Sequence, residues 1–205
     1  MTPTLLAIQA SPRSARSQSR ALGADFVALW KASHPDGIVS ALDLAETQPD
    51  LVTEAWVEGA FTAPDVQSPA AREAMATSDR FVAQLLSATE IVIATPMYNL
   101  SIPAVLKAWI DQIVRVGRTF AFEGGAFKGL ARATRVTVIV TSGSDFRPGT
   151  PAEGYNFVEP YLKALFGFIG IPDVRFVYAP NMNLDEPARS EVLAEARQTL
   201  KALAA

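Results

Sequence analysis

Five short apolar runs recur along the chain and constrain its fold more than any other feature. Most of them are continuous rather than alternating, which is typical of strands that are buried on both faces. Helical stripes, such as Leu22, Phe26, Leu29 and Trp30, separate them. The pattern predicts a doubly wound α/β sandwich around a five-stranded parallel sheet. The expected strands are Leu5–Ile8, Ile38–Leu44, Ile91–Thr95, Val136–Thr141 and Val174–Tyr178.

A doubly wound sheet binds ligands at the carboxyl ends of its strands, where the strand order switches. The loops after the first, third and fourth strands are therefore the candidate site. We find no internal repeat or linker and expect residues 1–205 to form one domain. Residues 49–69 are the least regular stretch, with three prolines, and we interpret them as a partly helical excursion that covers a partner or a pocket.

Composition excludes several kinds of chemistry. The absence of cysteine removes disulfides, thiolate catalysis and iron–sulfur ligation, so redox chemistry would need a bound cofactor. The one histidine, His34, rules out a His-rich metal site and is expected in a solvated loop. A net charge of −3 and a pI near 5.2 argue against a nucleic-acid surface. With no membrane-length apolar run and no leader-like start, we expect a cytoplasmic protein that does not bind membranes.

The loop after the first expected strand, Ser11 to Arg20, is rich in hydroxyls and arginines and leads into an amphipathic helix. A helix N-terminus presents unpaired N–H groups that bind phosphate well. No glycine precedes Gly23, which excludes the dinucleotide fingerprint and the Walker A loop. A serine-capped helix with solvated arginines is the alternative, and the loop alone leaves both readings open.

The loop after the third expected strand, Thr95 to Pro103, carries apolar groups at an exposed edge. Met97, Tyr98 and Leu100 offer surface for a flat ring, and the Asn99 amide could read a polar ring edge. Pro103 is expected in the first turn of the following helix. The alternative is a packed turn whose apolar residues belong to the core.

Taken together, Ser11, the Ser17-Gln18-Ser19 start, the Pro96-Met97-Tyr98-Asn99 loop and the run from Phe166 to Ile171 resemble the FMN-dependent NADH azoreductase and quinone reductase family of flavodoxin-like proteins. The resemblance spans nearly the whole chain and implies the strand order 2-1-3-4-5. It also implies that the phosphate of FMN is held by Ser11, Ser17, Gln18 and Ser19. The flavin ring would lie along Pro96, Met97, Tyr98, Asn99 and Leu100.

Two further segments follow from the resemblance. Relatives commonly show Ser-Arg-Gly-Gly after the fourth strand, where this chain has Ser142, Gly143, Ser144 and Asp145, so the arginine is lost. Phe122 stands where relatives often place a tyrosine in an aromatic flap over the substrate pocket. The alternative for this insertion is a hairpin turned by Gly124 and Gly125 with its phenylalanines in the core.

The function implied is an FMN-dependent NAD(P)H oxidoreductase that reduces quinones and azo compounds, with nitroaromatics as further acceptors, by ping-pong hydride transfer. The donor is NADH or NADPH, the flavin carries the chemistry, and neither a catalytic side chain nor a metal is expected. Family members pair as homodimers, so we expect a homodimer with its site near the interface. The alternatives are a flavodoxin-like electron carrier and an FMN reductase that uses flavin as a substrate.

Overall fold

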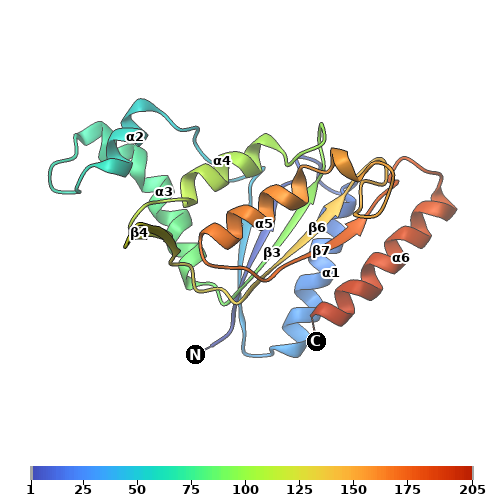
Figure 1. The fold of residues 1–205 in the computed structure, drawn as a ribbon. Coiled ribbons are helices and arrows are strands. Elements are labelled where there is room, and N and C mark those ends of the chain that lie inside the picture. Colours follow the sequence, from blue (N-terminus) through green and yellow to red (C-terminus); the bar gives the residue numbers. More distant parts are fainter. Residues whose placement is uncertain (1, 205) are drawn as a thin grey trace.

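Five parallel strands form the central sheet of the computed structural model, which describes residues 2–204 (Figure 1). The strands are β1 (Thr4–Gln9), β2 (Ile38–Asp43), β3 (Glu90–Pro96), β6 (Arg135–Thr141) and β7 (Val174–Ala179). Each lies within one residue of its predicted bounds. Their order, β2-β1-β3-β6-β7, confirms the predicted 2-1-3-4-5, because β6 and β7 are the fourth and fifth strands of this sheet.

Helices cover both faces of the sheet. The buried side chains of α1 (Gln18–Ser33) and α6 (Glu186–Leu203) pack on one face. Those of α3 (Pro69–Ser87), α4 (Ala104–Ile113) and α5 (Val158–Phe168) pack on the other. The layers are visible in Figure 1, where α1 and α6 run side by side. Within residues 2–204, no helix has the length and apolar character needed to cross a bilayer.

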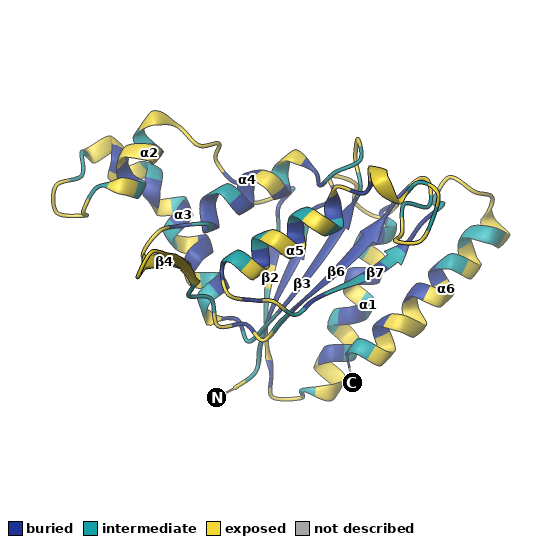
Figure 2. Ribbon diagram, in the orientation of Figure 1, coloured by how far each residue is buried: buried dark blue, intermediate teal, exposed yellow. Residues whose placement is uncertain are grey.

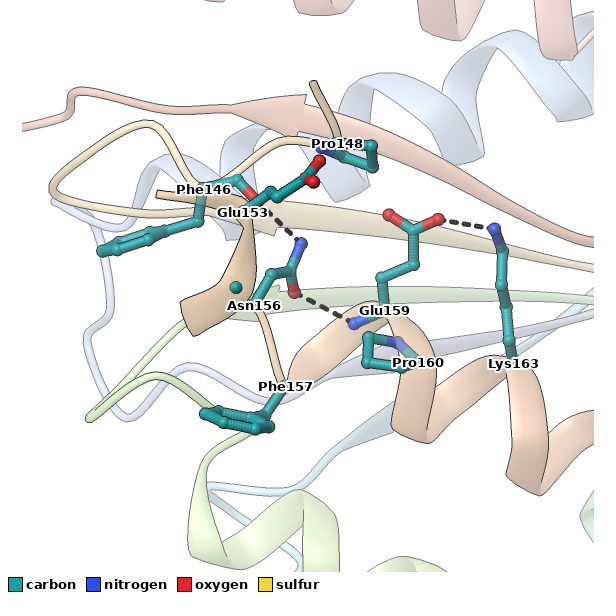
Figure 3. A pocket seen from close by; sticks show the side chains of 9 residues that line it. Phe146, Pro148, Glu153, Asn156, Phe157, Glu159, Pro160 and Lys163 are labelled. Carbon is teal, nitrogen blue, oxygen red and sulfur yellow. Dashed lines mark hydrogen bonds and ion pairs between the residues drawn. The ribbon is translucent and has the colours of Figure 1, made fainter. Parts of the chain in front are cut away.

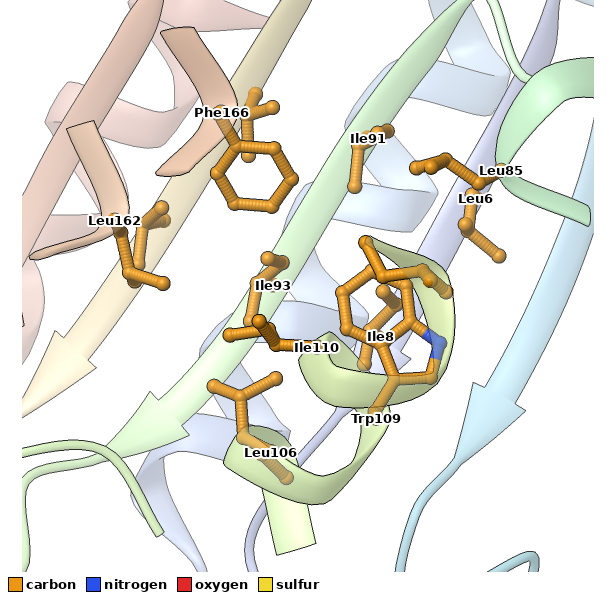
Figure 4. Packing of buried hydrophobic residues seen from close by; sticks show 14 of the residues in the cluster. Leu6, Ile8, Leu85, Ile91, Ile93, Leu106, Trp109, Ile110, Leu162 and Phe166 are labelled. Atoms are coloured by element: carbon orange, nitrogen blue, oxygen red, sulfur yellow. The ribbon is translucent and has the colours of Figure 1, made fainter. Parts of the chain in front are cut away.

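The middle strands explain why the apolar runs are continuous. Side chains of β1, β3 and β6 alternate between the two helix layers and are buried on both, as the dark strands of Figure 2 show. Figure 4 shows one of these layers, with Trp109 and Ile110 of α4 packed against Ile8 and Ile93 of the sheet. Edge strand β2 is more open, and its Ile38 is 56% exposed.

The excursion at residues 49–69 is partly helical, as expected, and holds α2 (Glu54–Phe61). Trp56 of this helix is buried within the chain. Its indole donates from Nε1 to Gln112 Oε1 at 2.7 Å, which anchors α2 to the end of α4. Phe61, one helical turn further on, is exposed.

The insertion before β6 is the hairpin of the alternative interpretation, formed by β4 (Phe120–Glu123) and β5 (Ala126–Gly129). Gly124 and Gly125 turn it with φ values of 60° and 82°, a region that favours glycine. Phe122 is 60% exposed, so this side chain is not part of the core.

His34 departs from its expected place in a solvated loop. It ends α1, stacks on the Trp30 ring at 4.5 Å between centroids, and places Nδ1 3.0 Å from the Trp30 carbonyl oxygen. Its ring is therefore part of the packing at the C-terminus of α1.

Candidate functional site

The first segment of the site is the N-terminus of α1. Ser17 is its N-cap, with Oγ accepting from the Arg20 backbone N–H at 3.4 Å and lying 3.2 Å from Ser19 Oγ. Both hydroxyls are buried. The serine cap of the alternative interpretation is thus present, and a helix N-terminus also offers further N–H groups without intrahelical partners, as an anion site requires.

Arg20 holds this segment against the neighbouring strand instead of being solvated. Its guanidinium donates to both carboxylate oxygens of Asp43, at the end of β2, and to the Ser11 carbonyl oxygen. The hydrogen bonds from Arg20 hold the pKa of Asp43 below its ordinary value. The Ser11 hydroxyl in turn accepts from the Arg13 N–H at 3.2 Å, so the loop backbone is fixed on both sides.

The second segment is a tight turn after β3. Tyr98 and Ser101 exchange backbone hydrogen bonds of 2.9 and 3.1 Å, which leaves Asn99 and Leu100 as the two central residues. Their φ values are 48° and 71°. Asparagine tolerates this region, whereas leucine there is strained by about 1–3 kcal/mol, and such strain is typical of functional loops. Pro103 is not inside the first helical turn as predicted but caps it, because α4 begins at Ala104.

The third segment follows β6 and is built around a glycine. A Cβ at Gly143 would lie 2.6 Å from Asn183 Nδ2, so the Asn183 side chain occupies the space next to this backbone. Asn183 comes from the loop after β7, which is attached by the hydrogen bond from the Met182 N–H to the Ser142 carbonyl oxygen. Neighbouring Asp145 pairs with Arg147, which lowers the pKa of its carboxyl.

A cavity of about 140 Å³ opens between these segments. Eight of the sequence-predicted residues line it: Ser11, Ser17 and Gln18 from the first loop, Pro96, Met97 and Tyr98 from the second, and Ser142 and Gly143 from the third. Four lining residues were missed: Arg13, Thr141, Met182 and Asn183. Arg13 lies in the first loop, which the sequence had already indicated. Met182 and Asn183 follow the end of β7, so the rule that ligands bind at the carboxyl ends of strands could have found them.

The remaining predicted residues lie outside the cavity lining. Ser19 is buried behind Ser17, and Asn99 and Leu100 form the turn next to Tyr98. The Ser144 carbonyl oxygen accepts from the Ser142 hydroxyl at 2.7 Å, and Asp145 is committed to Arg147. These positions support the wall of the cavity through their neighbours.

Phe122 is not brought to the cavity within one chain. The base of its hairpin packs on Ile169 and Gly170, which precede β7 and so lie at the starting edge of the sheet. The cavity follows the ends of β1, β3 and β6, at the opposite edge. Figure 1 shows β4 far from the tips of the strand arrows. Phe122 could cover this cavity only from a second copy of the chain.

The residues present fit FMN. One end of the cavity offers serine hydroxyls, the Gln18 amide and a helix N-terminus, which suit a phosphate. The other end offers Met97, Tyr98 and bare backbone at Gly143, which suit a flat ring at close approach. No group of three or more histidine, aspartate or glutamate side chains is placed to hold a metal ion within residues 2–204.

Known proteins match along almost the whole chain. A family model described as a flavodoxin-like fold matches residues 3–204. The FMN-dependent NADH:quinone oxidoreductase 2 of Trichormus variabilis is 42% identical over 197 residues, covering 96% of this chain and 95% of that protein. The FMN-dependent NADH:quinone oxidoreductase of Acidobacterium capsulatum is 44% identical over 203 residues, with 96% and 98% covered.

Solved structures agree with this match. The crystal structure of an azoreductase from Bacillus anthracis superposes with a TM-score of 0.90 at 26% identity, covering 100% of this chain and 99% of that one. A second azoreductase crystal structure gives 0.90 at 27% identity, with 98% of each chain covered.

Proposed function

This chain belongs to the family of flavodoxin-like FMN-dependent NADH:quinone oxidoreductases, and from that premise we propose that it binds FMN in the cavity at the ends of β1, β3 and β6. It is an FMN-dependent oxidoreductase that passes electrons from NADH to quinones and azo compounds, the activities named in its relatives. The observation that carries the assignment is the junction of a phosphate-type helix end with an apolar, glycine-backed wall in one cavity.

FMN, when bound, supplies the hydride chemistry, accepting two electrons from the donor and returning them to the acceptor. The protein's task is to bind and orient. Ser11, Ser17 and Gln18 would hold the phosphate, and the start of α1 would add its positive dipole end. The wall of Pro96, Met97 and Tyr98 and the Gly143 backbone would flank the ring. The rigid turn at Asn99 and Leu100 keeps Tyr98 in place.

Two other functions are compatible with this fold. An electron carrier and an FMN reductase that releases flavin would both share this fold, but the most similar relatives are named as FMN-dependent enzymes with NADH and a quinone as reactants. A bound yellow chromophore that survives gel filtration, together with NADH-dependent quinone reduction showing parallel double-reciprocal lines, is the expected result. Loss of flavin on filtration would favour the FMN reductase, and no turnover of NADH would favour the carrier.

The proposal includes a homodimer with its site near the interface. The excursion exposes five apolar side chains on one short stretch: Leu51, Val52, Val57, Phe61 and Val66. Exposed apolar side chains concentrated in one segment are typical of a protein interface. The exposed Phe122 points to the same arrangement, because only a second copy could bring it to the cavity. We expect residues 1–205 to form a single domain, and two such chains to form the dimer.

Light scattering at micromolar concentration, combined with activity on dilution, tests the dimer. We expect twice the monomer mass and a loss of quinone reduction when the dimer dissociates. A fully active monomer would contradict the interface. Phe61→Asp should weaken the dimer, whereas Tyr155→Asp, at an exposed aromatic residue outside the excursion, is the control.

The acceptors are quinones and azo compounds, with nitroaromatics as a further expected class. The acidic net charge of −3 supports the absence of a nucleic-acid partner. We also propose that the protein is located in the cytoplasm, where the nicotinamide donor is available.

A further inference from the structure

A second, larger cavity lies beside the proposed flavin site. It has a volume of about 480 Å³, within the range of small-molecule sites, and lies between the loop after β6 and the start of α5. Its walls are mainly apolar and include Phe146, Pro148, Phe157 and Pro160. Figure 3 shows Phe146 and Phe157 at one end, on either side of Asn156, and Lys163 at the other end.

This cavity is connected to the flavin site through one hydrogen bond and one loop. The Phe157 backbone N–H donates to the Leu100 carbonyl oxygen at 3.1 Å, and Leu100 belongs to the strained turn that follows Met97 and Tyr98. The loop after β6 runs from Ser142 and Gly143, which line the flavin cavity, to Phe146, which lines this one. A ligand that reaches the flavin ring and is longer than one ring system can therefore extend into the second cavity.

The aromatic end of the cavity is held in shape by a buried amide. Asn156 is buried, donates from Nδ2 to the Phe146 carbonyl oxygen and to the Tyr178 hydroxyl, and accepts from the N–H groups of Val158 and Glu159. Its hydrogen bonds fix the backbone that carries both phenylalanines. Phe157 is 54% exposed and so offers its ring for stacking with a flat base.

The charges of the cavity favour one kind of polar group. Glu159 is paired with Lys163 at 2.5 Å, and its other oxygen accepts from the Tyr178 hydroxyl. Glu153 accepts from the Gly149 N–H through Oε2 and forms no ion pair with a residue among positions 2–204. The uncompensated charge of the cavity is thus one carboxylate, which accepts hydrogen bonds from hydroxyl or amino groups and repels phosphate.

We propose that this second cavity binds the adenosine half of the nicotinamide donor, with Phe157 stacking on the adenine and Glu153 facing the ribose. The inference rests on the proposed function, because it assigns the part of NADH that does not react. A carboxylate that accepts from the ribose 2′-hydroxyl is the usual means of selecting NADH, whereas a 2′-phosphate calls for an arginine. A carboxylate at this position gives a structural reason for the use of NADH, the donor named in the relatives.

Titration calorimetry of the FMN-loaded protein with nucleotide fragments tests this site without turnover. We expect 5′-AMP to bind, and 2′,5′-ADP, which adds the 2′-phosphate, to bind about five- to tenfold more weakly at low salt. Replacing Glu153 by Gln should remove most of that difference. In kinetic assays, 5′-AMP should be competitive toward NADH and uncompetitive toward a small quinone, the pattern that a ping-pong enzyme gives when the inhibitor occupies only the donor site.

Matched variants separate the site from general damage. Phe157→Ala should weaken 5′-AMP about tenfold and leave the FMN dissociation constant unchanged, and Phe146→Ala provides a second, independent disruption. Tyr155→Ala is the control for both, since Tyr155 is similarly exposed in the same segment but does not line the cavity. Glu191→Gln on α6 is the control for Glu153→Gln.

Equal affinity for 5′-AMP and 2′,5′-ADP, or 5′-AMP binding that both phenylalanine variants leave intact, would overturn the inference. A changed quinone KM with unchanged nucleotide binding would assign the cavity to the acceptor instead. The calorimetric results do not depend on turnover, so failure of the proposed function would be seen separately, as FMN-loaded protein that binds 5′-AMP but does not oxidise NADH.

Discussion

Arg20 and Asp43 form a two-point ion pair that joins the first turn of α1 to the end of β2, and the same guanidinium donates to the Ser11 carbonyl oxygen. Arg20 thus fixes the loop at Ser11 and the start of α1, which together form the phosphate end of the cavity. An arginine in a phosphate-type loop is readily read as a phosphate ligand. Here its donors are directed at protein oxygens, and its role is to position Ser11.

Replacing Arg20 by Met should therefore act on both stability and cofactor binding. We expect the apo protein to lose about 1–2 kcal/mol of unfolding free energy, because charged hydrogen bonds at a partly buried pair are lost. FMN affinity should fall as well, since Ser11 loses its support. Urea denaturation and fluorescence titration measure the two effects. Arg16→Met, at an exposed neighbour, is the control; equal effects from both variants would contradict the positioning role.

The same pair sets a pH dependence. The folded-state pKa of Asp43 is lowered by Arg20, so its contribution to stability is complete above the unfolded value of about 4 and is lost as pH falls through the lowered folded value. The stability difference between wild type and Arg20→Met should be constant from about pH 5 to 7 and shrink below about pH 4. A difference that stays constant down to pH 2 would show that the stabilisation by Arg20 does not depend on the charge of Asp43.

A double variant can distinguish FMN binding by the two serines at the start of α1 from helix capping alone. Changing Ser17 and Ser19 together to alanine should weaken FMN binding, while the apo protein loses only the about 0.5–2 kcal/mol of a helix cap. Ser68→Ala is a matched control, because Ser68 caps α3 with the same Oγ geometry at 3.1 Å from the Ala71 N–H and lies outside the cavity. An FMN dissociation constant that is unchanged in the double variant would show that these serines only cap the helix.

Gly143 and Asn183 provide a cycle of variants. Gly143→Ala places a methyl group where Asn183 Nδ2 lies 2.6 Å away, so the amide must move off the cavity wall. Asn183 is an exposed, flexible side chain, and apo stability should change by less than about 0.5 kcal/mol. FMN affinity should fall in Gly143→Ala and recover in part when Asn183→Ala is added. Additive losses in the double variant would mean that the two residues act independently.

The layout of the sheet was predictable because its middle strands are buried on both faces, which leaves continuous apolar runs such as that of β3. The first two loops of the site were predictable for a related reason, since loops that follow strand ends must meet at one edge. Asn183 was missed although it obeys the same rule. Its relationship to Gly143, forty positions earlier, depends on how two loops pack, and no local pattern encodes that.

Long-range contacts also explain the other departures. In the sequence, Trp56 is an apolar residue in an irregular stretch. In the structure its indole is buried and donates to Gln112, which lies fifty-six residues later in the chain. Phe122 lies on a hairpin whose turn can be predicted from Gly124 and Gly125. The edge of the sheet to which that hairpin attaches is set by the close approach of Gly129 and Gly170, which requires that two distant segments each lack a side chain.

Electron transfer through bound FMN is measured most directly by an anaerobic titration of the FMN-loaded protein, first with NADH and then with a quinone. One equivalent of NADH should bleach the yellow flavin absorbance and one equivalent of quinone should restore it, with the cofactor still bound after gel filtration. Protein that takes up no FMN, or whose bleached form the quinone does not reoxidise, would contradict this expectation.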